Sequence, residues 1–236
     1  MSLIGITGGV GTGKSLAAQA LRDLGAVVFS ADEAAREAAA PGSQVLRAIE
    51  QQFGPRALQP DGTLDRRWLA DRVFRDPEAR RVLESLTHPA ILAILRRQIE
   101  EARARLGPEA VIVVEAPLLF EAGMAGWFDA ILAITAPEEV QIARLMRRDG
   151  LTQDEARLRI AAQMPLEEKA ARADFVVPNT GTPEDLKRRI GQIYPLLRRA
   201  HERGAARASA PGRAARGAEE SKAGGQNSCG GLARML

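Results

Sequence analysis

Short runs of apolar residues alternate with helix-like patterns along residues 1–200. The runs read SLIGIT, AVVF, VIVV, AILAI and DFVV, at 2–7, 26–29, 111–114, 130–134 and 174–177. After the first run, leucine and alanine recur at helical spacing over residues 15–24. Continuous apolar runs of four or five residues, separated by helices, are typical of a parallel sheet covered on both faces. The pattern therefore predicts an α/β fold with a five-stranded parallel sheet.

Two segments interrupt this alternation. The long interval between the second and third runs reads as helices and turns, including one helix from about Pro89 to Leu106 with isoleucine and leucine along one side. The Arg-rich segment 137–171 predicts two helices: one has Pro137 in its first turn, and the other has Thr152 and Glu155 in capping-box spacing. We expect one domain over 1–200 with a helical insertion and a lid; the core is 1–35, 108–136 and 172–200, the insertion 36–107 and the lid 137–171.

Composition places the chain among ordinary globular proteins. Hydrophobic residues make up 45% and charged residues 27%. No stretch approaches the ~18 uninterrupted apolar residues of a membrane span. The first residues, MSLIGITGG, lack the basic stretch and cleavage site of a secretory signal, and a lone Cys229 excludes an intrachain disulfide. We expect a cytoplasmic protein with no membrane partner.

The net charge of +3 arises in the last residues of the chain. Residues 201–236 hold six basic and three acidic side chains, a difference of +3, so residues 1–200 sum to zero. This Ala-, Gly- and Arg-rich tail has few large apolar residues and is expected to be disordered. A neutral body with 4% aromatic residues lacks the charge and stacking side chains of a nucleic-acid binder. We therefore expect no nucleic-acid partner.

Residues 8–15, GGVGTGKS, fit the phosphate-loop pattern G-x-x-x-x-G-K-[ST] between a predicted strand and a predicted helix. Glycines let backbone N–H groups surround phosphate oxygens, and the following helix presents its positive end to the anion. The alternative is a glycine-rich turn that only caps a helix. The pattern favours a nucleoside triphosphate, with Ser15 as a Mg²⁺ ligand. The candidate phosphate-binding residues are Gly9, Gly11, Thr12, Gly13, Lys14 and Ser15.

Asp32 follows the second predicted strand. Its position favours a kinase over other classes of protein that contain such a phosphate loop. Ligand sites in open α/β sheets lie beyond the carboxyl ends of the strands, so Asp32 is expected to project toward the same crevice as Lys14. This makes Asp32 a candidate base for an acceptor hydroxyl. Taken alone, an Asp after a strand is more often a helix N-cap. Neither the N-K-x-D motif of guanine selection nor the L-S-G-G-Q motif of transporter ATPases occurs.

Arg144, Arg147 and Arg148 lie on one predicted helix of the lid, with 144 and 148 on the same face. They could clamp the transferring phosphoryl group. Equally, they could form a basic surface that pairs with Glu138, Glu139 or Asp149.

In several blocks the chain resembles the dephospho-coenzyme A kinase family, over residues 3–195. The blocks read ITGGVGTGKS, SADEAARE, DGTLDRRWLADRVF, LESLTHP, PLLFEAG and ADFVVPNTG, at 6–15, 30–37, 61–74, 83–89, 117–123 and 173–181. The resemblance implies a P-loop kinase that transfers a phosphoryl group from ATP to the ribose 3′-hydroxyl of dephospho-coenzyme A. Its partners would be ATP, Mg²⁺ and dephospho-coenzyme A, in a monomer or small homo-oligomer.

The resemblance also implies roles for individual residues. Asp32 would be the base, Lys14 would bind ATP, and Arg144 would stabilise charge as a catalytic residue. Arg148 and Asn179 would bind the nucleotide, although Asn179 also suits a plain turn. The acceptor would contact Arg66, His88, Pro117 and Leu118. His88 equally suits a helix cap.

The chain departs from the family pattern at two positions. Ser30 stands where an aspartate is common, and Glu115 ends the third predicted strand where an aspartate is more usual. A carboxylate one methylene longer could still hold a magnesium-bound water. Two rival functions remain: a nucleoside monophosphate or sugar kinase on the same scaffold, and a nucleotide-dependent switch or assembly ATPase.

Overall fold

The computed structural model describes residues 1–202, apart from the side chain of Phe74. Except for His201 and Glu202, the predicted basic tail lies outside the described residues, and so does Cys229. Among the described residues, no helix has both the length and the apolar character needed to cross a membrane.

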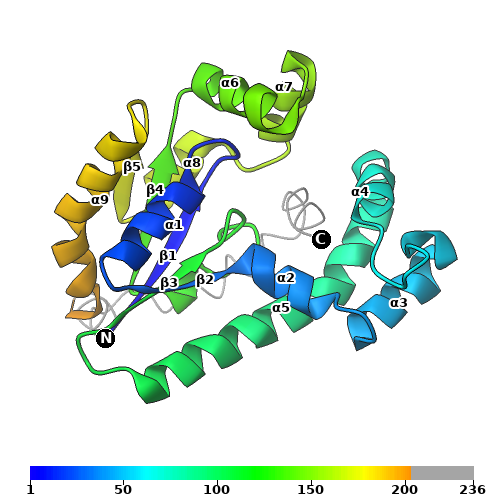
Figure 1. Ribbon diagram of the computed structural model, residues 1–236, viewed down its shortest axis with the longest axis horizontal. Helices are drawn as coiled ribbons and strands as arrows, with labels where there is room; N and C mark the ends of the chain where they lie inside the picture. Colours follow the sequence, from blue (N-terminus) through cyan, green and yellow to red (C-terminus); the bar gives the residue numbers. More distant parts are fainter. Residues whose placement is uncertain (203–236) are drawn as a thin grey trace, which may run out of the picture. The chain divides into compact units, whose positions relative to one another are not determined.

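Within residues 1–202, five strands form one sheet in the order β2-β3-β1-β4-β5 (Figure 1). The strands are β1 (Ser2–Gly8), β2 (Val27–Ser30), β3 (Val111–Glu115), β4 (Ala130–Thr135) and β5 (Phe175–Pro178). β1 pairs in parallel with β3 and β4, and β4 pairs in parallel with β5. The predicted five-stranded parallel sheet is confirmed. Because β1 is central, the loop that follows it lies at the middle of the sheet's carboxyl edge.

Alternate residues of β1 face opposite sides of the sheet. Ile4 and Ile6 belong to a buried cluster that includes residues of α1 (Lys14–Asp23) and α9 (Pro183–Arg198). Gly5 faces the other side, where an added Cβ would overlap Leu119. α8 (Leu166–Arg172) contacts β1 and β4, and Figure 1 shows it behind the sheet from α1. Both faces are therefore covered.

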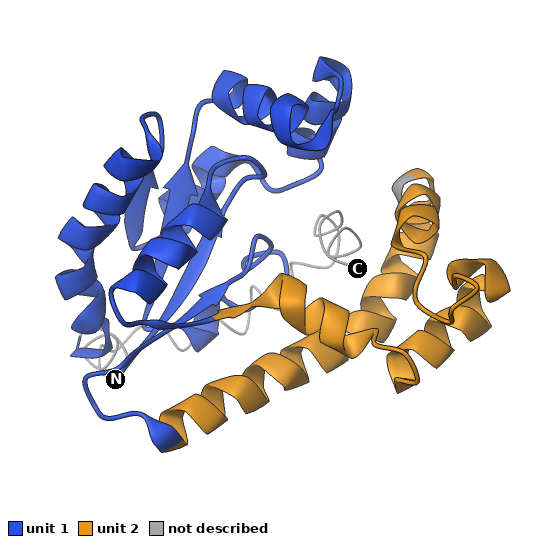
Figure 2. Cartoon of the chain, viewed as in Figure 1, with its two compact units in different colours: residues 1–28, 105–228 blue, residues 29–104, 229–236 orange. Residues whose placement is uncertain are grey.

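The chain divides into two compact units (Figure 2). One contains Met1–Val28 and the described residues from Arg105 onward, including most of the sheet. The other is Phe29–Ala104 and is mainly helical. Its elements are α2 (Ala31–Ala38), α3 (Gln44–Phe53), η1 (Pro55–Ala57), α4 (Arg66–Arg75) and nearly all of α5 (Pro77–Arg105).

The helix expected to begin at Pro89 begins twelve residues earlier, at Pro77, and Pro89 lies in its interior. A proline inside a helix lacks the N–H that would bond to the preceding turn. Here Leu83, Ile91 and Leu95 are buried on either side of it, so tertiary packing holds the helix continuous. The predicted start at Pro89 was wrong, because the burial of these side chains overrides the local tendency of proline to begin a helix.

The described segment 137–171 contains three helices where two were expected. α6 (Glu138–Asp149) has Pro137 as its N-cap rather than as its first helical residue. α7 (Gln153–Ala161) begins with the expected capping box of Thr152 and Glu155. These two helices pack together around Leu145 and Ala156. The third helix, α8, was not predicted. It packs against β4 and β1, and its Lys169 is fully buried. Between β3 and β4 lies the short η2 (Ala125–Trp127).

Candidate active site

The phosphate loop joins β1 to α1 and ends at Gly13, whose φ of 95° lies in the left-handed region. An added Cβ at this position would overlap Asn179 Nδ2, so glycine is required for both backbone and packing reasons. Within the described residues, no side chain caps the N-terminus of α1. Its first N–H groups therefore face the loop and form a site suited to an anion.

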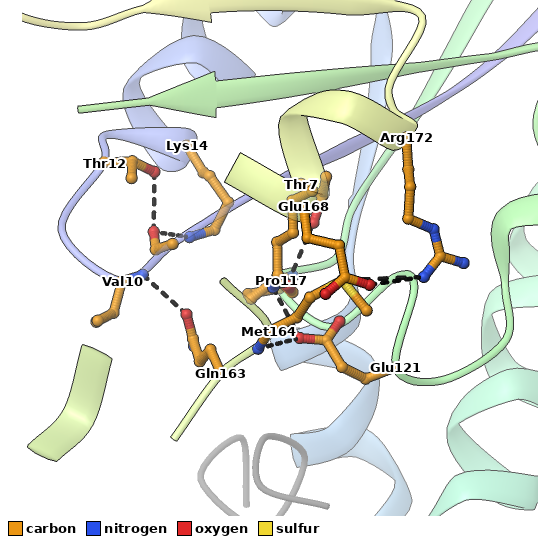
Figure 3. Close-up of polar contacts among 12 residues, drawn as sticks. Thr7, Val10, Thr12, Lys14, Pro117, Glu121, Gln163, Met164, Glu168 and Arg172 are labelled. Carbon is orange, nitrogen blue, oxygen red and sulfur yellow. Dashed lines mark hydrogen bonds and ion pairs between the residues drawn. The ribbon is translucent and has the colours of Figure 1, made fainter. Parts of the chain in front are cut away.

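Two side chains of the loop converge on one carbonyl. Lys14 Nζ and Thr12 Oγ1 each donate a hydrogen bond of 2.8 Å to the Gly9 carbonyl (Figure 3). Lys14 is largely buried and Thr12 completely so. The ammonium group is thus held inside the curve of the loop, where its positive charge adds to that of the helix N-terminus.

Asn179 braces the loop from the turn after β5. Its Nδ2 donates to the Thr12 carbonyl at 2.8 Å, and its backbone N–H donates to the Thr135 carbonyl at 2.7 Å. The side chain is buried. Asn179 therefore does more than form a turn, because it fixes the conformation of the last residues before α1.

The three arginines of α6 divide between the two alternatives. Arg144 Nη1 donates to the Gly11 and Thr12 carbonyls at 3.1 and 3.3 Å, and its Nη2 donates to the Asn179 carbonyl at 3.1 Å. Burial, and then the charge of Arg147, lower the pKa of Arg144. Its guanidinium thus lies against the phosphate loop.

Arg148 instead pairs with Asp149 at 2.7 Å, and this hydrogen bond raises the pKa of Arg148 and lowers that of Asp149. Arg147 is exposed. Of the three, the structure brings Arg144 to the loop and gives Arg148 one of the acidic partners considered for a surface role.

Ser15 and Glu115 bring hard oxygen atoms together beside the loop. Ser15 Oγ donates to Glu115 Oε1 at 2.9 Å, since Glu115 ends β3 in register with Ile6 of β1. A hydroxyl and a carboxylate suit Mg²⁺, which usually keeps water and substrate phosphates as its other ligands. The described part of the chain has no cluster of three or more His, Cys, Asp or Glu able to hold a metal by itself.

Asp32 is not the N-cap of α2. Ser30 fills that position, and its Oγ accepts from the Glu33 N–H at 3.4 Å. Serine and aspartate are both good N-caps, so the departure at Ser30 keeps this structural role. Asp32 lies in the first turn and is half-buried. Because it belongs to the Phe29–Ala104 unit, its proximity to Lys14 stays a prediction.

The acceptor candidates fall in both units. Arg66 begins α4 after the Asp65 N-cap; burial and the charge of Arg36 lower its pKa. It lines a cavity of about 530 Å³ with Arg36 and Arg67. Within α5, burial lowers the pKa of His88, whose Nε2 has no hydrogen-bond partner among the described residues. His88 therefore caps nothing through that atom.

Pro117 and Leu118 follow β3 in the unit that holds the phosphate loop. Leu118 is buried, while Pro117 is half-buried and offers its carbonyl to Thr7 Oγ1 at 3.2 Å. Thr7 directly precedes the phosphate loop, so this hydrogen bond connects the start of the phosphate loop to the start of the loop after β3.

Sequence reasoning missed two residues beside these loops, Gln163 and Lys169. Gln163 Oε1 accepts from the Val10 N–H of the phosphate loop at 3.0 Å. Lys169 Nζ pairs with Glu121 Oε1 at 2.8 Å and donates to the Pro117 carbonyl at 2.6 Å. One signal was present: the sequence has only four lysines, and Lys169 lies amid acidic residues in a short helix. No sequence pattern marks Gln163.

Comparison with known proteins gives a consistent result. The family model described as dephospho-CoA kinase matches residues 2–185. The chain is 48% identical over 198 residues to the dephospho-CoA kinase of Anaeromyxobacter dehalogenans, a match that covers 84% of this chain and 93% of that protein. It is 45% identical over 199 residues to that of Moorella thermoacetica, with 84% and 93% covered.

Solved structures agree with the sequence relatives. The dephospho-CoA kinase of Campylobacter jejuni is similar with a TM-score of 0.62 and 28% identity, covering 84% of this chain and 98% of that one. A Thermus thermophilus protein is similar with a TM-score of 0.64 and 39% identity, covering 83% and 97%.

Proposed function

The chain belongs to the dephospho-CoA kinase family, and we propose that its phosphate loop, Asp32 and the loop after β3 carry the transfer to the ribose 3′-hydroxyl. As a member, the protein is a transferase that phosphorylates dephospho-coenzyme A with ATP in coenzyme A biosynthesis. Family membership thus selects this activity over a monophosphate or sugar kinase and over a switch ATPase.

The observation that carries the proposal is the position of Lys14. Its ammonium is buried on the Gly9 carbonyl at the uncapped N-terminus of α1. Backbone N–H groups of the loop would bind the phosphates of ATP, apart from that of Val10, which donates to Gln163, and Lys14 would lie near the outer phosphates. Arg144 would stabilise charge on the transferring phosphoryl group from its place on the Gly11 and Thr12 carbonyls. Asn179 would bind the nucleotide, and its hydrogen bond to the Thr12 carbonyl supports the phosphate loop. Arg148 would bind the nucleotide from the last turn of α6.

We assign Mg²⁺ to Ser15 and Glu115. The hydrogen bond between their side chains supports this, because it places two oxygen donors at the carboxyl edge of the sheet. When bound, Mg²⁺ supplies positive charge to the phosphates of ATP. Glu115 would hold a water of the ion, which suits a carboxylate one methylene longer than aspartate.

On the acceptor side, Asp32 would accept the proton of the 3′-hydroxyl. The pocket residue Arg66 and His88 of α5 would contact dephospho-coenzyme A, together with Pro117 and Leu118. Residues 36–107 would form the acceptor domain and 137–171 the lid, within a core of 1–35, 108–136 and 172–200. The enzyme would act in the cytoplasm as a monomer or small homo-oligomer.

An acceptor panel tests the proposal. The full chain is incubated with ATP, Mg²⁺ and dephospho-coenzyme A, a nucleoside monophosphate or gluconate, and the product is located by phosphorus NMR. We expect a 3′-phosphate on dephospho-coenzyme A and no turnover of the other two. Lys14→Ala should lower this turnover by orders of magnitude, with the exposed Lys187→Ala as the matched control. Turnover of another acceptor, or phosphorylation at a different hydroxyl, would refute it.

A further inference from the structure

Lys169 is fully buried, although it is charged. Burial lowers the pKa of its ammonium, and the nearby carboxylate of Glu121 opposes this shift. Nζ pairs with Glu121 Oε1 at 2.8 Å, and the Glu121 side chain is itself only 12% exposed. A buried ion pair often adds little stability compared with apolar side chains of the same size. The contacts that this pair makes with neighbouring loops therefore matter more here than the stability that it adds.

The pair holds the loop after β3. Lys169 Nζ donates to the Pro117 carbonyl at 2.6 Å, and the same carbonyl accepts from Thr7 Oγ1 at 3.2 Å. Arg172, one turn further along α8, lies over the ring of Phe120 at 4.5 Å. Side chains of α8 thus contact the loop at Pro117, Phe120 and Glu121.

The same contacts continue to the phosphate loop (Figure 3). Glu121 Oε1 also accepts from the Met164 N–H at 3.2 Å. The preceding residue, Gln163, accepts from the Val10 N–H at 3.0 Å. Residues 163 and 164 join α7 to α8, so the connection between these helices is bonded on one side to the loop after β3 and on the other to the phosphate loop.

We propose that Lys169 is a positioning residue for phosphoryl transfer, which fixes the loop after β3 relative to the phosphate loop and so sets the affinity for dephospho-coenzyme A. This inference rests on the proposal that Pro117 and Leu118 line the acceptor site. Lys169 acts through the Pro117 carbonyl and the Glu121 carboxylate, and takes no part in the chemistry. Because the groups of a binding site must be held to within about 0.5 Å by the residues that support them, a small displacement of this loop would weaken acceptor binding.

Lys169→Met tests the inference, because methionine keeps the length of the side chain and removes both polar contacts. We expect the KM for dephospho-coenzyme A to rise about tenfold and the KM for ATP to change less than about twofold. The dissociation constant of dephospho-coenzyme A, measured by calorimetry without ATP, should rise by the same factor. Lys187→Met on the surface of α9 is the matched control and should leave every value unchanged.

Glu121→Gln supplies a second route if Lys169→Met does not fold. Glutamine keeps one oxygen for Lys169 and Met164 but removes the charge, so the acceptor KM should rise about threefold. Glu167→Gln, at an exposed position of α8, is its control. The double variant should bind the acceptor no more weakly than Lys169→Met, because the two side chains act as one unit.

A purely structural role predicts a different result. Both variants would then lower the melting temperature and the active fraction while leaving the acceptor KM and dissociation constant unchanged, and this would overturn the inference. Failure of the wild-type chain to phosphorylate dephospho-coenzyme A would instead contradict the proposed function. The two failures are distinguished by the wild-type measurement alone.

Discussion

Asn179 Nδ2 and the Thr12 carbonyl are joined by a buried hydrogen bond of 2.8 Å that spans 167 positions of the sequence. The turn after the edge strand β5 thereby supports the phosphate loop after the central strand β1. The same amide nitrogen occupies the space beside Gly13 where a side chain would otherwise project. The shape of the phosphate loop is therefore set by a partner far along the chain, as well as by its own glycines.

Gly13→Ala tests this support. Its positive φ is unfavourable for alanine, and the new Cβ would displace Asn179, so we expect the KM for ATP to rise more than about tenfold and the melting temperature to fall. Gly25→Ala is the matched control, because Gly25 also has a positive φ, 93°, but open space around it. It should lower stability by about 1 kcal/mol and leave the KM for ATP unchanged. Equal kinetic effects at both positions would show that backbone strain alone matters.

Arg144→Met should lower kcat about 100-fold, because a positive charge is lost beside the loop that holds the transferring phosphate. Arg147→Met, at an exposed position of the same helix, should retain nearly full activity. Steady-state kinetics at saturating ATP separate the two variants. Similar losses in both would indicate a general contribution of basic charge on α6 rather than a specific one from Arg144.

Asp32→Asn should lower kcat by about 100-fold or more, since a carboxamide cannot accept the proton of the 3′-hydroxyl. The dissociation constant of ATP should change less than about twofold. The adjacent Glu33→Gln, on an exposed side chain, controls for lost charge in the first turn of α2. Weaker ATP binding with unchanged kcat would assign Asp32 to the nucleotide or its metal, and the base would have to be sought elsewhere.

Glu115→Gln should raise the Mg²⁺ concentration needed for half-maximal rate about tenfold, because the side chain that would hold a water of the ion loses its charge. Glu115→Asp should stay close to the wild type, since it keeps the carboxylate. Glu138→Gln, exposed in the first turn of α6, is the matched control. A Mg²⁺ titration of initial rates measures all three, and an unchanged requirement in Glu115→Gln would exclude this residue from the metal site.

His88 should make stability depend on pH. Burial lowers the pKa of its imidazole in the folded protein, so the unfolded chain binds a proton more readily as the pH falls below about 6.5. The free energy of unfolding should therefore decrease from pH 7 towards pH 5, and less steeply in His88→Gln. Urea unfolding at several pH values measures this difference. Parallel pH profiles would show that other groups cause the acid sensitivity.

Local patterns were enough to predict much of this protein. Each strand of the sheet is a continuous apolar run, and the phosphate loop is a contiguous motif whose glycines and lysine act within eight residues. Where tertiary packing opposed local chemistry, the sequence misled. Pro89 is an ordinary helix breaker, yet burial of Leu83 and Ile91 carries α5 through it. α8 was missed because its burial comes from Lys169, which reads as a surface residue.

The sequence by itself predicted the strands, the phosphate loop, Lys14 and Ser15, because each is marked by a pattern within one turn or one strand. Only the tertiary structure decided that Arg144 lies on the loop while Arg148 pairs with Asp149, and that Lys169 holds the Pro117 carbonyl. A hydrogen bond needs two groups within about 3 Å, and the path of the chain through space, rather than residue type, brings such distant groups together.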